Sequence, residues 1–345
     1  MEIQNSTLVL LPPGAIHFNA SYMNYEFRFD SFPTILAAVA WFYMIPTLVV
    51  IFKIVSVYTK TDWSQLEPGK NQHVFLVISL SLAFSYLFFI CDYLSNRLWS
   101  TGIFTSICAR TAPNHWLKLV IFITFYFNFC AMPFPVLLPV IRLIIMMHPK
   151  RFNEINAVII RYSIPATLVF PLFLTFYLIP AVGVCRQLDY PYPFGSIWIY
   201  YYGPWFDLRI SKFFIVNTIT WMSLATIVNS VLFFKVARAK ERLIAVQTNG
   251  ISYNAQNSIT RITVIMILFY LLNGSVMLVY YLFSGISSIA SYTIFFRSFV
   301  NELQICTVSW VFYRTHPAFK DTVADAEVHA KRKEPVANLS NWFSK

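Results

Sequence analysis

The sequence predicts an all-α integral membrane protein, a bundle of seven transmembrane helices with the N-terminus outside the cell and the C-terminus in the cytoplasm. Three observations support this prediction. Of the 345 residues, 57% are hydrophobic and only 12% are charged, whereas soluble domains carry about 25% charged residues. Seven long apolar runs follow one another along the chain. Basic residues gather between alternate runs, as the positive-inside rule requires of a membrane protein.

The apolar runs are long enough to be transmembrane helices, which need about 20 mostly apolar residues to cross a hydrocarbon core about 30 Å thick. The chain then divides into an extracellular segment (1–31), the bundle (32–313) and a cytoplasmic tail (314–345) with an expected short amphipathic helix. Prolines 133, 135 and 139 predict a kink in the third helix. The runs occupy residues 32–58, 73–94, 116–147, 156–182, 213–237, 259–283 and 292–313.

The distribution of basic residues predicts the orientation. The alternation of the runs assigns 18 of the 26 Lys and Arg residues to one side and 8 to the other, and the richer side is cytoplasmic. Asn5 and Asn19 begin glycosylation triplets on the predicted outer side. No basic start with an apolar core precedes residue 32, so we expect no cleaved signal peptide.

Two cysteines lie in predicted outer loops, where a disulfide can form. Cys108 is in the first outer loop and Cys185 at the mouth of the second, so a bridge between them is the leading expectation. Pairing of Cys91 with Cys108 and free thiols remain alternatives. The cysteine spacing resembles no zinc site, and we expect neither a metal nor a cofactor.

Polar groups inside the predicted spans are candidates for ligand binding, because buried polar groups are costly in a membrane. Glu302 shares a helix face with Ser298, Ser309 and Tyr313, and this stripe should face the bundle. The alternative for Glu302 is an interhelical hydrogen bond from its protonated form. Arg297, one turn outward, is expected to extend toward the interface.

Three asparagines extend the predicted ligand site. Asn128, Asn217 and Asn273 lie in the third, fifth and sixth runs, where they either line an outward cavity with Glu302 or join helices by hydrogen bonds. The second outer loop is rich in proline and aromatic residues. It either covers a ligand or forms an aromatic belt at the membrane interface.

The predicted inner side carries a basic surface below the fifth helix. Lys235, Arg238 and Arg242 fall on one helix face, where they contact an acidic partner or anionic lipid or serve only as a topology signal. The formal charge of +11 is explained by topology, so nucleic acid is not an expected partner. The sequence contains no phosphate-binding loop, nucleophile elbow or catalytic dyad, and we expect no enzyme.

Two segments resemble motifs of rhodopsin-like receptors. Arg142 followed by Pro149 is similar to their Asp-Arg-Tyr segment, although Ile141 and Leu143 replace the flanking acid and tyrosine. Tyr313, followed by a phenylalanine six residues later, resembles the end of their seventh helix, although its Asn and Pro are missing.

A closer resemblance is to the nematode serpentine receptor class U chemoreceptors. It implies a chemosensory G-protein-coupled receptor in the plasma membrane of a sensory cilium. A small molecule or peptide would bind on the outer side, and a heterotrimeric G protein would dock near Arg142, Tyr313 and the basic surface. The alternative is a seven-helix ligand-gated cation channel or a transporter. The matching segments are FPTI (32–35), PTLVVIFK (46–53), FYFN (125–128), PVIRL (139–143), IPAVGVCRQL (179–188) and PYPFG (191–195).

Overall fold

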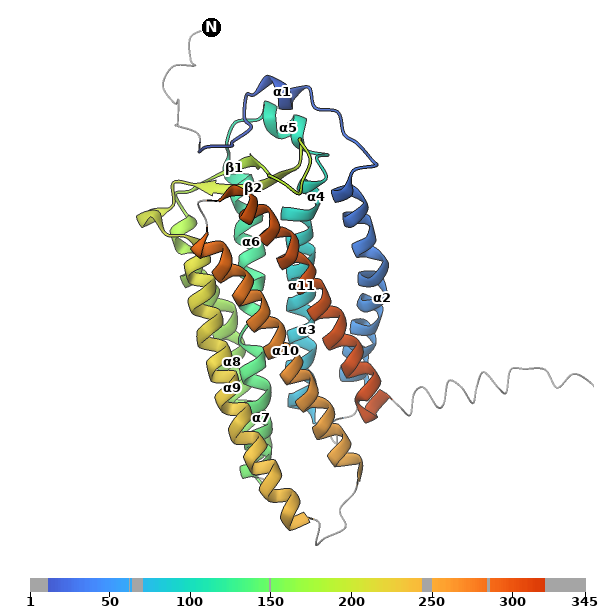
Figure 1. Ribbon diagram of the computed structural model, residues 1–345. Helices are drawn as coiled ribbons and strands as arrows, with labels where there is room; N and C mark the ends of the chain where they lie inside the picture. The colour runs from blue at the N-terminus through green and yellow to red at the C-terminus, as the bar shows by residue number, and fades with distance from the viewer. Residues whose placement is uncertain are drawn as a thin grey trace, which may run out of the picture.

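Long helices run side by side through most of the molecule (Figure 1). The computed structural model describes residues 12–61, 63, 71–148, 150–243, 250–283 and 286–319. In chain order the long helices are α2 (Phe32–Lys60), α3 (Gln72–Asp92), α6 (His115–Ala131), α7 (Phe134–Met147), α8 (Phe152–Thr175), α9 (Ile210–Leu243), α10 (Gly250–Leu282) and α11 (Ser287–Thr315). The helical class predicted from the sequence is confirmed.

Six stretches of the described helices are long and apolar enough to cross a membrane, and they coincide with the first six predicted spans. Large apolar side chains cover their outer faces; Phe42, Val216 and Ile219 are 80%, 65% and 61% exposed. Such surfaces suit lipid and not water. The chain is therefore a multi-pass membrane protein.

The seventh predicted span is helix α11, which packs against α10, α2 and α3. Helix α11 is not among the six apolar stretches, and its sequence contains several polar residues. They are nevertheless buried within the bundle, as the helical stripe predicts: Ser298, Glu302 and Ser309 are at most 4% exposed. A helix that turns its polar groups inward can still present an apolar face to lipid.

Two helix ends differ from the prediction. Helix α3 continues past residue 94 through a π-helical turn, η1 (Tyr93–Arg97), into α4 (Leu98–Ser100). Helix α8 stops at Thr175 and closes with a 3-10 turn, η2 (Phe176–Leu178), short of the predicted end at 182. Pro180 explains the early end, because a proline has no N–H with which to continue the helical hydrogen bonds.

The third predicted span is broken where its prolines begin. Helix α6 ends at Ala131, and α7 begins at Phe134 directly after Pro133. Pro133 has no N–H to donate to the preceding turn, whereas Pro139 is accommodated inside α7. The break lies where the sequence predicts a kink.

The second predicted outer loop forms an antiparallel hairpin of β1 (Val182–Gln187) and β2 (Ile197–Tyr202). Ile197, Ile199 and Tyr201 are buried, because alternate strand residues point to the same side. Figure 1 shows α1 (Ala20–Met23) and α5 (Thr105–Arg110) at the same end of the bundle, which we call the hairpin end. A 3-10 turn, η3 (Trp205–Asp207), leads from β2 toward α9.

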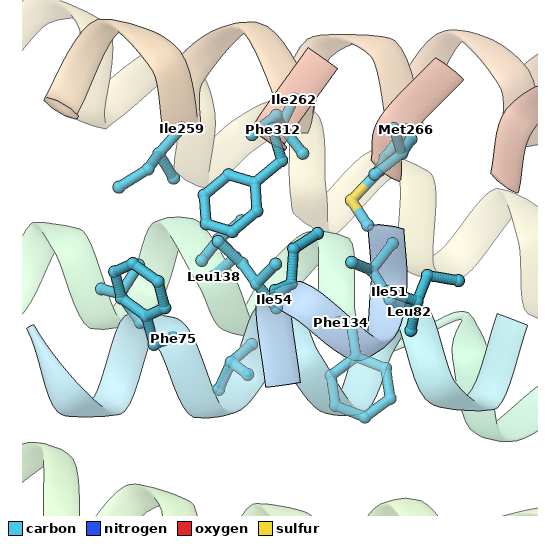
Figure 2. Packing of buried hydrophobic residues seen from close by; sticks show 14 of the residues in the cluster. Ile51, Ile54, Phe75, Leu82, Phe134, Leu138, Ile259, Ile262, Met266 and Phe312 are labelled. Atoms are coloured by element: carbon cyan, nitrogen blue, oxygen red, sulfur yellow. The ribbon is translucent and has the colours of Figure 1, made fainter. Parts of the chain in front are cut away.

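Of two hydrophobic core clusters among the described residues, one lies at the hairpin end and the other fills the bundle toward its opposite end. Figure 2 shows Phe75, Phe134 and Phe312 among aliphatic side chains from several helices. After α11 the chain makes one 3-10 turn, η4 (Pro317–Phe319), whose Phe319 joins the core. The amphipathic tail helix remains a prediction, because residues beyond 319 lie outside the described part.

Candidate functional site

A cavity of about 260 Å³ lies at the hairpin end. Its walls come from five helices of the bundle and from both hairpin strands, so segments far apart in the sequence meet there. The lining residues are Asp92, Ser95, Asn96, Ile121, Thr124, Phe125, Arg186, Trp198, Ile199, Tyr200, Tyr201, Arg209, Ile210, Ser211, Met277, Tyr280, Thr293, Ile294, Arg297 and Ser298.

The lining combines positive charge with aromatic surface. Arg186, Arg209 and Arg297 outnumber the single acid Asp92, so the formal charge of the lining is +2. Five of the lining side chains are aromatic. An apolar pocket with a few charged groups is the usual form of a small-molecule site.

Arg297 is the most deeply placed of the three arginines. Its guanidinium carbon lies 5.9, 5.0 and 5.2 Å from the ring centroids of Phe88, Phe125 and Phe214. Aromatic faces at such distances attract a cation. The residue is only 9% exposed. The predicted extension of Arg297 toward the interface is therefore wrong, because three rings from α3, α6 and α9 hold it inside the bundle.

Asp92, at the end of α3, faces the same cavity. One carboxylate oxygen accepts a hydrogen bond of 2.9 Å from Asn96, and the other accepts one of 2.9 Å from Ser298 on α11. Both donors also line the cavity. The π-helical turn η1 supplies Asn96, and such insertions often mark functional sites.

Glu302, the predicted ligand acid, is paired with a buried arginine. Arg97 Nε and Nη2 donate to the two carboxylate oxygens at 2.7 and 2.8 Å, and Tyr43 donates to the same carboxylate. The side chains of Arg97 and Glu302 are 6% and 3% exposed. The ion pair ties η1 to α11, and neither Arg97 nor Glu302 lines the cavity.

The three predicted asparagines also lie away from the cavity. Asn217 donates to Met132 Sδ at 2.8 Å and accepts from Trp221 Nε1 at 2.9 Å. Asn273 donates to Asn301 on α11. These contacts match the alternative in which amides join helices. Ligand contact by Glu302, Asn128, Asn217 and Asn273 stays a prediction.

A cover closes the hairpin end. We use this name for residues 12–25, α5 and the β1–β2 hairpin. Cys108 of α5 and Cys185 of β1 form a disulfide, and Cys91 is a free thiol. The structure thus has the leading pairing and not the Cys91 alternative. His17 lies beside the two disulfide sulfurs and completes the one candidate metal-ligand group in the described residues. Since both thiols are oxidised, the group suits no metal ion.

His17 fastens the N-terminal segment to the hairpin. Its Nδ1 donates to the Thr111 carbonyl at 2.6 Å, and its Nε2 accepts from the Cys185 N–H at 2.9 Å. This pattern requires the neutral imidazole, because a protonated Nε2 cannot accept. Burial lowers the pKa of His17 below its ordinary value of 6.5, which keeps the ring neutral.

Aromatic side chains complete the cover. Tyr22 stacks on Phe194 with ring centroids 4.6 Å apart. The ring of Tyr25 lies against Gly195, where a Cβ would collide with it. Gly195 also has φ +89°, so only glycine fits this position without strain. Asn19 is exposed and caps α1, and Asn5 lies outside the described residues.

The opposite end holds the predicted G-protein contacts. Arg142 is 1% exposed and donates to Thr260 Oγ1 of α10 at 2.8 Å. Tyr313 lies 5.5 Å from Lys53 Nζ and 5.2 Å from the Phe319 ring. Lys235 is exposed on α9. Arg238 and Arg242 continue that helix, but their side chains lie outside the described part.

The sequence analysis missed Asp92 and Arg97 as buried charges. Asp92 falls in the last turn of the predicted run 73–94, and Arg97 lies three residues beyond its end. Intramembrane charges usually have a partner. Glu302 was the partner to look for, but nothing in the spacing placed it beside Arg97.

Comparison with known proteins identifies the family of the chain. The family described as "Serpentine type 7TM GPCR chemoreceptor Sru" matches residues 16–322. The chain is also 31% identical over 261 residues to "Serpentine receptor class U-26" of Caenorhabditis elegans, which covers 76% of this chain and 89% of that protein. The chain therefore belongs to the class U family of serpentine seven-transmembrane chemoreceptors.

Proposed function

We propose that the protein is a chemosensory receptor of the plasma membrane, in a sensory cilium, that binds a ligand on the outer side and activates a heterotrimeric G protein inside. The hairpin end then faces outward and the opposite end faces the cytoplasm. The disulfide of the cover supports this orientation, because disulfides persist in oxidising compartments. The excess of basic residues on the other side supports it as well.

One observation carries the proposal: a single helix touches both functional ends. Met277 and Tyr280 of α10 line the cavity, and Thr260 of the same helix holds Arg142. A ligand that shifts one end of α10 would therefore affect the Arg142–Thr260 hydrogen bond near its other end. Rigid elements of this kind can couple two sites.

The Arg142–Thr260 hydrogen bond keeps α7 and α10 together, which is the arrangement we assign to the resting receptor. A ligand activates by binding the open arrangement more tightly. Coupling energies between such sites are about 1–3 kcal/mol. A G protein would then dock at the inner ends of α7 and α9, beside Arg142 and the basic surface of Lys235, Arg238 and Arg242.

The experiment measures basal G-protein activation in cells that express the receptor with each of a panel of Gα subunits. Arg142→Ala should abolish the signal while delivery to the cell surface stays normal. Arg151→Ala is the matched control, because this arginine is 75% exposed and pairs with Glu154 three residues away. Unchanged signalling from Arg142→Ala, or equal loss from Arg151→Ala, would remove the role assigned to Arg142.

A further inference from the structure

The side chain of Arg297, in the cavity wall, has hydrogen-bond donors that are not used. Arg297 Nε and Nη2 are buried and have no hydrogen-bond partner among the described residues. A guanidinium has five N–H donors and no acceptor. A buried donor that lacks a partner costs free energy, so a ligand that supplies an acceptor at this position would bind favourably.

Asp92 does not meet that need. Its carboxylate oxygens accept hydrogen bonds from Asn96 and Ser298, and neither accepts one from Nε or Nη2 of Arg297. Its charge offsets that of Arg297 in part, but Nε and Nη2 of Arg297 still lack an acceptor, and both residues line the cavity. Since the described residues supply no acceptor for these donors, a ligand in the cavity can supply one.

The remaining lining selects the charge of the ligand. Arg186 and Arg209 add two further positive charges to the cavity wall. A positive field attracts anions and raises their local concentration. An amine would face three arginines and only one acid, Asp92, in the lining. An anion is therefore favoured over a cation.

The lining and the volume select the body of the ligand. Phe125 offers aromatic surface beside Arg297, and Trp198 and Tyr280 add aromatic surface to the same cavity. The volume of about 260 Å³ lies just below the range of about 300–1,000 Å³ that is usual for drug-sized ligands. This size suits one or two rings and is too small to enclose a peptide.

We propose that the cavity binds a small organic acid, with its carboxylate on Arg297 and an aromatic body against the surrounding rings. Access to the cavity from outside the cell rests on the proposed function. The pairing of an anion with Arg297 does not, because it can be measured on the purified protein.

The test uses the full chain in lipid nanodiscs in low-chloride buffer. The probes are phenylacetate, 4-hydroxyphenylacetate and indole-3-acetate, each beside its neutral primary amide, with sodium chloride as a separate arm. Binding is measured as the rise in thermal unfolding midpoint with probe concentration. We expect at least one acid to bind about ten- to a hundredfold more tightly than its amide, the range for a hydrogen bond to a charged group.

Arg297→Gln should remove the preference for the acid. Thr293→Phe leaves the arginine in place and fills the cavity from α11, so it should block acid and amide alike. Arg28 is an exposed arginine outside the cavity, and Arg28→Gln should change neither the binding of the acid nor that of the amide. If Arg297→Gln does not fold, the acid–amide comparison on the wild type and the Thr293→Phe variant decide the question.

Several outcomes would overturn the proposal. They are equal binding of acids and amides, an unchanged preference in Arg297→Gln, no stabilisation by any acid at millimolar concentration, or stabilisation by chloride that no acid exceeds. Failure of the receptor function looks different: the acids would bind as expected but would not alter G-protein activation in cells.

Discussion

Removing Glu302 should destabilise the bundle strongly, because it leaves a buried arginine without its partner. Arg97 donates to both carboxylate oxygens at 2.7 and 2.8 Å, and both side chains are almost fully buried. Loss of one partner of such a pair costs about 3–5 kcal/mol, since the remaining charge keeps its desolvation penalty. Glu302→Ala should lower stability by about this amount.

The double variant distinguishes this explanation from simple loss of packing. When both charges are replaced by apolar residues of similar volume, the desolvation penalty disappears with the attraction. The free energy of unfolding of the double variant Arg97→Met with Glu302→Met should therefore lie within about 1 kcal/mol of the wild-type value, or above it. Each single variant should be far less stable.

The assay is thermal or denaturant unfolding of the purified receptor for the four members of the cycle. An exposed ion pair is the control: Arg28 and Asp30 lie 3.7 Å apart with side chains 73% and 78% exposed. Asp30→Ala should cost less than about 1 kcal/mol. If the effects of Arg97→Met and Glu302→Met add up in the double variant, the two residues are not coupled and the reasoning fails.

Three further predictions concern the cover and the inner end. Cys185→Ser should lower stability by about 4 kcal/mol in the chain-entropy view, since the bridge spans 77 residues. It should also reduce delivery to the cell surface. Normal delivery and heat resistance of Cys185→Ser, or an equal effect of Cys91→Ser, would count against this prediction. The cover should loosen as the pH falls below about 6.5, because the lowered pKa of His17 means that the loosened form binds a proton more readily. Proteolysis of residues 12–25 should therefore accelerate in acid, and His17→Phe should abolish that pH dependence; acceleration that persists in the variant would refute it. Thr260→Ala should raise basal G-protein activation by releasing Arg142, whereas Thr260→Ser should not; equal basal signals would contradict the resting contact.

The helical part of the fold was predictable because lipid imposes one simple rule. A spanning helix must be long and apolar, so the length and apolar character of successive runs located the spans. Helix ends were less predictable, because they depend on local chemistry. Pro180 ended α8 early, and the continuation of α3 through η1 gave no distinct signal in the sequence. The hairpin was read only as an aromatic, proline-rich loop, since its strands are short.

The candidate site was less predictable than the fold. Polar residues in the spans could be identified, but which of them meet depends on helix rotation and packing. Glu302 was correctly placed facing the bundle, yet its partner Arg97 lies 205 residues away. Arg297 was predicted to be an interfacial residue from its place near the end of a span. The three rings that enclose it come from three other helices, and the sequence does not show which helices pack together.

The orientation of the chain is the claim on which the proposed function depends most directly. An epitope tag placed before Glu2 should be accessible to antibody in intact cells, because the hairpin end is assigned to the outside. Surface biotinylation confirms that the protein reached the plasma membrane. Staining of intact cells is the predicted result. Staining only after permeabilisation, with surface delivery confirmed, would reverse the topology, put the cavity and its arginine on the cytoplasmic side, and contradict the receptor mechanism.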